Sequence, residues 1–171
     1  MTTRTERDTF GPIDVPADRL WGAQTQRSLQ NFAISGEQMP HELIRALAMV
    51  KWAAADANQQ LGSLPAKKAK AIRAACQALI AGKHHQAFIL DPVQGGAGTS
   101  TNMNANEVIA NLALIEMGEQ PGNYAALHPN NDVNMSQSTN DVYPTALRLA
   151  AIFATYGLIK ALSDLADSFA A

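Results

Sequence analysis

The sequence contains little cysteine, few aromatic residues and few charges. Cys76 is the only cysteine among the 171 residues, so no disulfide can form within the chain, and its Ala-rich surroundings favour a small core residue. Charged residues make up 16% and the net charge is −2, which leaves no basic excess to attract nucleic acid or an anionic membrane surface. Low charge together with abundant alanine favours helices that are buried on several sides.

Targeting and membrane signals are also missing. The first residues carry Arg4, Glu6, Arg7 and Asp8 without an apolar run, which does not resemble a secretion signal. The longest uncharged run near the C-terminus, 149–159, is too short to cross a bilayer. We therefore expect a cytoplasmic protein that binds neither nucleic acid nor a membrane.

The spacing of apolar residues predicts a mainly α-helical chain. The expected helices are 41–60, 66–81, about 102–117, and a last one from about 140 to 171. Residues 1–40 are expected to be irregular apart from short extended pieces at 13–15 and 32–34, and 119–134 is expected to be a loop. Nothing in the sequence ends the last helix, and its only proline, Pro144, falls in the first turn. We expect its apolar face to dock in a bundle that is supplied by the rest of a larger protein or by other chains.

Two short runs of glycine, hydroxyl and amide residues are the most informative feature. Gly95–Asn102 and Ser136–Asp141 each stand where a predicted helix begins. Free N–H groups and the dipole at a helix start favour an anion, and glycine lets the backbone approach it closely. Ser, Thr and Asn side chains add neutral hydrogen-bond donors. Two such helix starts can hold the two ends of a dicarboxylate, or two separate anions.

Other chemistries lack the residues they need. No Gly-Lys-Ser/Thr follows the glycine run, so it is not a P-loop, and no strand–helix–strand pattern surrounds it as in a dinucleotide site. No Gly-x-Ser-x-Gly provides a nucleophile elbow. His84 and His85 have no further ligands at metal-binding spacing, so we expect no metal site. Taken singly, each polar run is also explained as an ordinary cap before a helix.

In their order and spacing, these runs resemble the amino-terminal third of the fumarase/aspartase superfamily of lyases. The resemblance extends over essentially the whole chain. Residues 11–32 are similar to class II fumarases, whereas Gly96–Ser100 and Ser136–Asp141 have the aspartase form. The resemblance implies a homotetramer with a mainly α fold. Residues 1–138 would form an amino-terminal helical domain with short extended segments, and residues 139–171 would be the start of a long central-bundle helix.

The resemblance also implies which residues form the site. The substrate-binding residues would lie at the two helix starts: Thr99, Ser138, Thr139 and Asn140. A possible second carboxylate site, known from fumarases, would be formed by His128, Asn130 and Asn131. The arginine that accompanies this second loop in fumarases is replaced here by Ala125 or a neighbour. The base serine belongs to a flexible segment that these 171 residues do not contain, and no metal or organic cofactor is implied.

The implied function is elimination across a C–C bond of a small dicarboxylate or amino-acid substrate. The first hypothesis is the amino-terminal region of an aspartate ammonia-lyase, which makes fumarate and ammonia from L-aspartate. The alternatives are a class II fumarase, which hydrates fumarate to L-malate, and a non-catalytic, truncated helical interaction module. Because the base serine is missing, the isolated 171-residue chain is predicted to be inactive.

Overall fold

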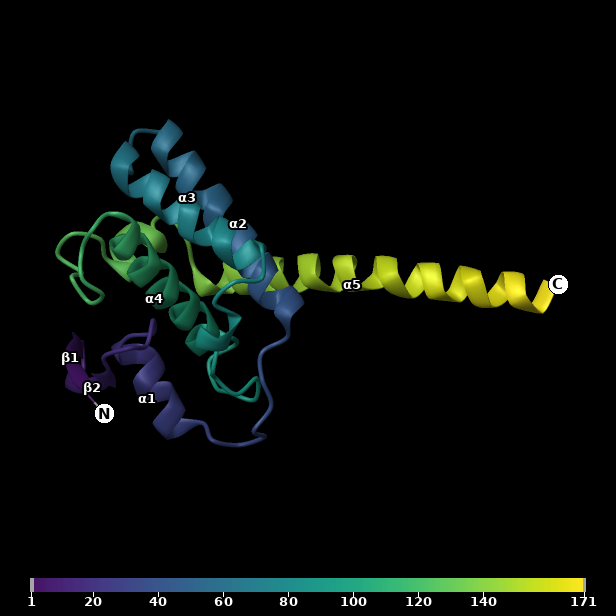
Figure 1. The fold of residues 1–171 in the computed structure, drawn as a ribbon, viewed down its shortest axis with the longest axis horizontal. Coiled ribbons are helices and arrows are strands. Elements are labelled where there is room, and N and C mark those ends of the chain that lie inside the picture. The colour runs from purple at the N-terminus through teal and green to yellow at the C-terminus, as the bar shows by residue number, and fades with distance from the viewer. Residues whose placement is uncertain (1, 171) are drawn as a thin grey trace.

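The computed structural model describes residues 2–170, and it confirms a mainly α fold (Figure 1). The elements in chain order are β1 (Thr3–Asp8), β2 (Gly11–Pro16), α1 (Ala23–Asn31), α2 (His41–Gln60), α3 (Ala66–Ile80), the 3₁₀ turn η1 (His85–Ala87), α4 (Thr99–Glu116), the π-turn η2 (Pro129–Val133) and α5 (Thr139–Ala170). The expected helices 41–60 and 66–81 are confirmed, the second ending one residue earlier. Their starts follow Pro40 and Pro65, which cannot donate a backbone hydrogen bond to a preceding turn.

The core lies where α2, α3 and α4 pack together and against the first turns of α5. Large side chains of these three helices are almost completely buried: Ile44, Leu47, Ile72, Leu79, Ile109 and Leu114. Cys76 of α3 is also fully buried, which confirms it as a core residue, and burial raises the pKa of its thiol to about 12. The core therefore forms a rigid support beneath the starts of α4 and α5.

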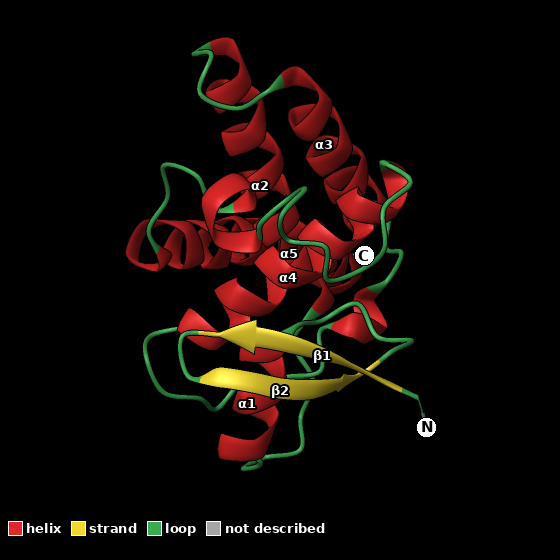
Figure 2. Ribbon diagram, turned by 90° about the vertical axis from the view of Figure 1, so that its left-hand side faces the viewer, coloured by secondary structure: helices red, strands yellow, loops and turns green. Residues whose placement is uncertain are grey.

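The first forty residues are more ordered than expected. β1 and β2 form an antiparallel hairpin that lies beside α1 (Figure 2), with Thr5 opposite Asp14 and Glu6 opposite Ile13. The extended piece expected at 13–15 belongs to β2, but the one expected at 32–34 is not a strand. Neither β1 nor α1 was expected. The α1 sequence is short and mostly polar, so its helical state depends on contacts with the rest of the fold.

Two boundaries also differ from expectation. α4 begins at Thr99 rather than near residue 102, because Gly98 adopts a left-handed conformation at φ +87° and the helix follows it directly. The predicted loop 119–134 contains the π-turn η2, which starts after His128. Both differences place polar side chains at the beginning of a helical segment.

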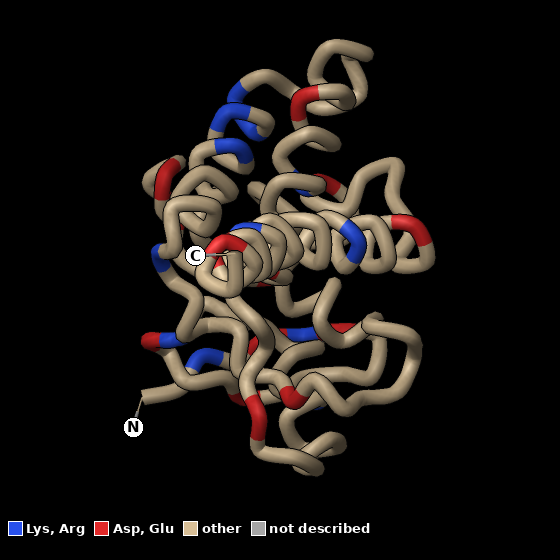
Figure 3. Tube along the Cα trace, turned by 90° about the vertical axis from the view of Figure 1, so that its right-hand side faces the viewer, with Lys and Arg blue, Asp and Glu red and all other residues tan. Residues whose placement is uncertain are grey.

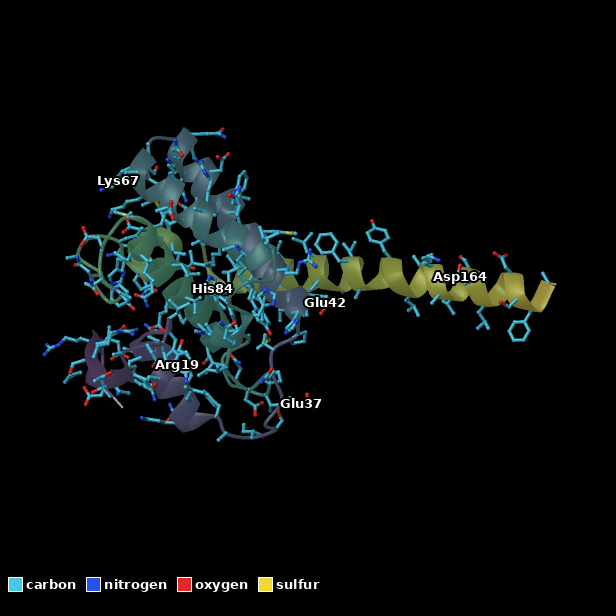
Figure 4. All side chains as sticks on the ribbon, in the orientation of Figure 1. Arg19, Glu37, Glu42, Lys67, His84 and Asp164 are labelled. Carbon is cyan, nitrogen blue, oxygen red and sulfur yellow. The ribbon has the colours of Figure 1, made fainter. Side chains whose placement is uncertain are left out.

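α5 leaves the compact part of the molecule and extends as a single projecting helix (Figure 1). Val142, Ala146 and Ala150 are buried, whereas the described residues beyond Ala150 are exposed. The exposed large side chains include Tyr156 at 67% and Phe169 at 84%. In Figure 4 the outer part of this stretch, around the labelled Asp164, stands clear of the rest of the chain, and its side chains point outward. An isolated helix with this much exposed apolar surface needs partner helices.

By length and composition alone, α5 is apolar enough to cross a membrane, with a mean hydropathy of 1.4 in its best window. The uncharged run 149–159 is shorter than this 18-residue window, which therefore includes residues outside the run. A helix packed inside a water-soluble assembly can have the same composition. Figure 3 shows α5 nearly end-on as a mostly uncharged tube, with Lys, Arg, Asp and Glu scattered over the rest of the chain.

Candidate functional site

The start of α4 is held against α5 by a close contact at Gly98. A Cβ atom at this position would lie 2.4–2.6 Å from ring atoms of Tyr143, so only glycine fits between the two helices. The positive φ of Gly98 also disfavours any other residue. The glycine run therefore allows the two helix starts to approach each other.

Gly98→Ala should destabilise the chain by about 3 kcal/mol, since left-handed strain adds to overlap with the Tyr143 ring. Gly118→Ala is a matched control, because Gly118 has a similar φ of +82° but nothing within 4 Å of the added Cβ. The control should lose only about 1 kcal/mol. Urea denaturation measures both values, and equal losses would show that Tyr143 moves aside without cost.

Thr99 is exposed in the first turn of α4. Its Oγ1 donates to the Gly96 carbonyl oxygen at 2.5 Å, which closes the glycine loop. Gln94 supports the same loop, because its Oε1 accepts from the Thr101 N–H at 2.9 Å and from Thr101 Oγ1 at 3.0 Å. In this arrangement the hydroxyl proton of Thr99 is taken up by the hydrogen bond to Gly96. Thr99 therefore orders the helix start, and its oxygen keeps free acceptor capacity.

The start of α5 carries the second polar run. Ser138 and Asn140 are exposed, and Ser138 Oγ accepts from the Asn140 N–H at 3.2 Å. Thr139 is half-buried, and its Oγ1 accepts from Asn102 Nδ2 of α4 at 2.9 Å. Since the Thr139 oxygen accepts this bond, its hydroxyl proton can be donated to a ligand. The structure thus brings Thr139 of the second run next to Asn102, one turn after Thr99 of the first.

A buried polar cluster beneath these helix starts was not predicted. Lys51 of α2 is 0% exposed, and its Nζ donates to Asn134 Oδ1 at 2.7 Å. A signal was present in the sequence, because Lys51 falls on the same helical face as Ile44, Leu47 and Ala55. A lysine within an apolar stripe indicates a buried charge with a specific partner.

His128, Asn130 and Asn131 form a separate region. His128 Nδ1 accepts from the N–H groups of Asn130 at 3.0 Å and Asn131 at 3.2 Å, so any proton on the neutral ring is on Nε2. Burial lowers the pKa of His128, which favours the neutral ring at pH 7. The Asp132 carboxylate accepts from the His128 N–H and pairs with Lys68 at 2.8 Å, which fixes the turn.

A cavity of about 280 Å³ lies beside this turn. Its lining includes His128 and Asn130, together with Arg7 from β1 and Glu107 from α4, but not Asn131 or the four residues at the helix starts. Arg7 therefore provides a guanidinium in the region where the arginine expected by resemblance is absent. Among residues 2–170, no three His, Cys, Asp or Glu side chains are grouped so as to hold a metal ion.

Fold and site together define a helical domain in which two helices begin side by side with hydroxyl and amide side chains, an arrangement suited to a small anion. The lyase family model matches residues 11–171, and the chain belongs to this family. The similar proteins carry the names of two different enzymes. The chain is 59% identical to fumarate hydratase class II of Ralstonia nicotianae and 56% identical to aspartate ammonia-lyase of Pseudomonas aeruginosa, and covers 37% and 36% of their lengths. Each alignment includes 99% of this chain.

Solved structures give the same assignment of the fold. The native fumarate lyase:delta crystallin of Brucella melitensis superposes with a TM-score of 0.96 and 53% identity, over 98% of this chain and 38% of that one. The recombinant class II fumarase of Schistosoma mansoni gives a TM-score of 0.82 at 40% identity, over 87% of this chain and 32% of that one. The chain therefore spans about a third of the length of these relatives.

Proposed function

We propose that the chain contributes to the active site of an aspartate ammonia-lyase, which converts L-aspartate into fumarate and ammonia. The observation that carries this proposal is the Asn102–Thr139 hydrogen bond, which joins the two polar helix starts. Ser138, Thr139 and Asn140 would bind a substrate carboxylate, and Thr99 would order the facing loop. His128, Asn130 and Asn131 would form the second carboxylate site, with Arg7 supplying its positive charge.

The proposed chemistry fits neutral donors. When a base removes the proton next to a carboxylate, that carboxylate gains charge as an enediolate before ammonia leaves. Preorganised hydroxyl and N–H donors stabilise this added charge more than they stabilise the ground state. The hydroxyl proton of Thr139 is suitable for this role, since the Thr139 oxygen already accepts from Asn102. The base itself would come from a serine on a segment outside these 171 residues.

The assembly is part of the proposal. Residues 1–138 would form one domain, and residues 139–171 would enter a central bundle of a cytoplasmic homotetramer. The exposed apolar side chains of α5 beyond Ala150 support this arrangement, because burial in a bundle would remove them from water. No partner nucleic acid or membrane is proposed.

A class II fumarase is the second candidate. The 11–32 segment favours it, as does the 59% identical relative with that name. The aspartase form of Gly96–Ser100 and Ser136–Asp141 favours the first candidate, because these residues lie at the helix starts that would meet the substrate. Both reactions use fumarate, so the same two helix starts serve either one.

Turnover with L-aspartate and with L-malate tests the proposal. The protein is purified in the length that its cell produces, its intact mass is measured, and fumarate formation is followed by ultraviolet absorbance. A protein with a mass well above 18.2 kDa should release fumarate from aspartate, whereas the 171-residue chain alone should not. Turnover of malate alone would select the fumarase. No turnover of either substrate by the longer form would contradict the elimination chemistry and favour a non-catalytic module.

A further inference from the structure

Lys51 is an ionisable side chain on a largely apolar helix face. It lies on the buried face of α2 and is 0% exposed. Within the described part of the chain, Lys51 Nζ donates one hydrogen bond, to Asn134 Oδ1 at 2.7 Å. Asn134 directly follows the π-turn η2 and precedes the polar run that begins α5.

Asn134 connects this ammonium to both helix starts. Its Oδ1 also accepts from Asn102 Nδ2 at 3.3 Å and from Asn106 Nδ2 at 3.2 Å, both on α4. Its Nδ2 donates to the carbonyl oxygen of Gln137, the residue before Ser138, at 3.1 Å. Asn102 in turn donates to Thr139 Oγ1. One amide side chain therefore links Lys51, the first turns of α4 and the backbone that enters α5.

We propose that Lys51 is a positioning residue: through Asn134 it sets the placement of Ser138 and Thr139 against α4, and its charge favours an anion at the paired helix starts. The inference deepens the proposed function and rests on it for the identity of the anion, a small carboxylate. The positioning role itself rests on contacts within the chain and does not depend on which anion binds.

The surroundings of Lys51 make its charge responsive near neutral pH. Burial lowers its pKa to about 7, and this effect is opposed by Cys76 of α3 and Asp141 of α5. From the segment after η2, the amide of Asn134 meets it. From α4, the amides of Asn102 and Asn106 donate to the same Asn134 oxygen. Asp141 stands in the first turn of α5, so Lys51 is near enough to that turn for charge to act between them.

Packing alone does not account for a lysine here. A buried ammonium is costly to desolvate, and apolar residues of similar size often replace buried charges without loss of stability. Methionine has nearly the same length, and Asn134 Oδ1 would keep its two donors from α4. Lys51→Met should therefore fold, with a melting temperature at pH 6 no lower than that of the unchanged chain.

Backbone amide NMR of the 171-residue chain tests the positioning role without any ligand. The amides of Ser138 and Thr139 should titrate with a midpoint near pH 7, and this titration should vanish in Lys51→Met. Ile44→Val is the control, because it changes the same buried face of α2 without touching Asn134. It should keep the titration. Amides that do not titrate, or that titrate equally in Lys51→Met, would overturn the proposal.

A second variant guards against a failure of Lys51→Met to fold. Asn134→Asp keeps the size of the side chain and places a carboxylate against Nζ, which raises the pKa of Lys51, although it gives up the Nδ2 donor to the Gln137 carbonyl oxygen. The midpoint at the Ser138 and Thr139 amides should then move upward by at least about one pH unit. An unmoved midpoint would show that the titration has another source and would refute the role of Lys51.

The charge effect is measured separately on the active form of the protein. If a bound carboxylate raises the pKa of Lys51 by about one unit, linkage gives about tenfold tighter binding when Lys51 is protonated. The KM for aspartate should then rise about sevenfold from pH 6 to pH 8.5, and Lys51→Met should remove this dependence. A retained dependence would contradict the charge effect. Absence of all turnover would contradict the proposed function, while the amide titration still decides the positioning role.

Discussion

Glu107→Ala is expected to destabilise the chain by about 4 kcal/mol and to release α1 from the rest of the fold. The Glu107 carboxylate, 3% exposed on α4, accepts from the backbone N–H groups at the start of α1: Gly22 at 2.8 Å, Gln24 at 2.8 Å and Thr25 at 3.1 Å. Without it, three donors that are buried or partly buried lose their acceptor. Each such loss costs about 1–3 kcal/mol, and the cost is smaller where the freed N–H group can form a hydrogen bond to water.

The same helix start has a second carboxylate. Glu6 of β1 accepts from the Ala23 N–H at 3.0 Å and from Tyr124 Oη at 2.9 Å, and it pairs with Arg4 at 2.7 Å. Gly22 is required between the two carboxylates, because a Cβ there would lie 2.5 Å from Glu6 Oε2. Glu6 keeps one contact after Glu107 is removed, so α1 should detach locally before the core unfolds.

Hydrogen exchange and urea denaturation measure the effect. In Glu107→Ala the amides of Gly22, Gln24 and Thr25 should lose protection, while those of α2 and α3 should retain most of theirs. Glu116→Ala is the control on the same helix, since Glu116 is exposed and should change stability by less than about 0.5 kcal/mol. If both variants lost equal stability, Glu107 could not be the cap of α1.

This capping also explains why α1 could not be predicted from the sequence. Its own residues offer no side-chain cap and few apolar side chains, and the groups that satisfy its N–H donors lie as far away as residue 107. By contrast, α2 could be predicted because Pro40, the apolar spacing and Gly62 are all local signals. Local patterns specify a helix that carries its own signals, but not one that depends on distant partners.

The candidate site shows the same division. The polar runs at Thr99 and Ser138 could be recognised from composition, but their approach depends on the Gly98–Tyr143 and Asn102–Thr139 contacts between helices. The link through Lys51 joins residues 83 positions apart. The sequence could indicate that Lys51 is buried, because it interrupts an apolar stripe, but it could not indicate which residue accepts its hydrogen bond.

In the active form of the protein, Thr139→Val is expected to lower kcat/KM by about 10²–10³. Valine matches threonine in shape but has no hydroxyl. The Thr139 oxygen accepts from Asn102, so its proton is the part of the group left for the substrate carboxylate. A donor aimed at charge that develops in the transition state acts mainly on the chemical step, so kcat should fall more than KM rises.

Thr139→Ser separates the missing hydroxyl from the changed packing. Serine keeps the oxygen that meets Asn102 Nδ2 and the proton that can be donated, so kcat/KM should stay within about tenfold of the unchanged protein. Asn102 also donates to Asn134 Oδ1 at 3.3 Å, and that contact should hold the helix start in Thr139→Val. A loss of the same size in both variants would assign the effect to packing at the α4–α5 contact. A loss confined to the valine variant assigns the effect to the hydroxyl group, which serine keeps and valine lacks.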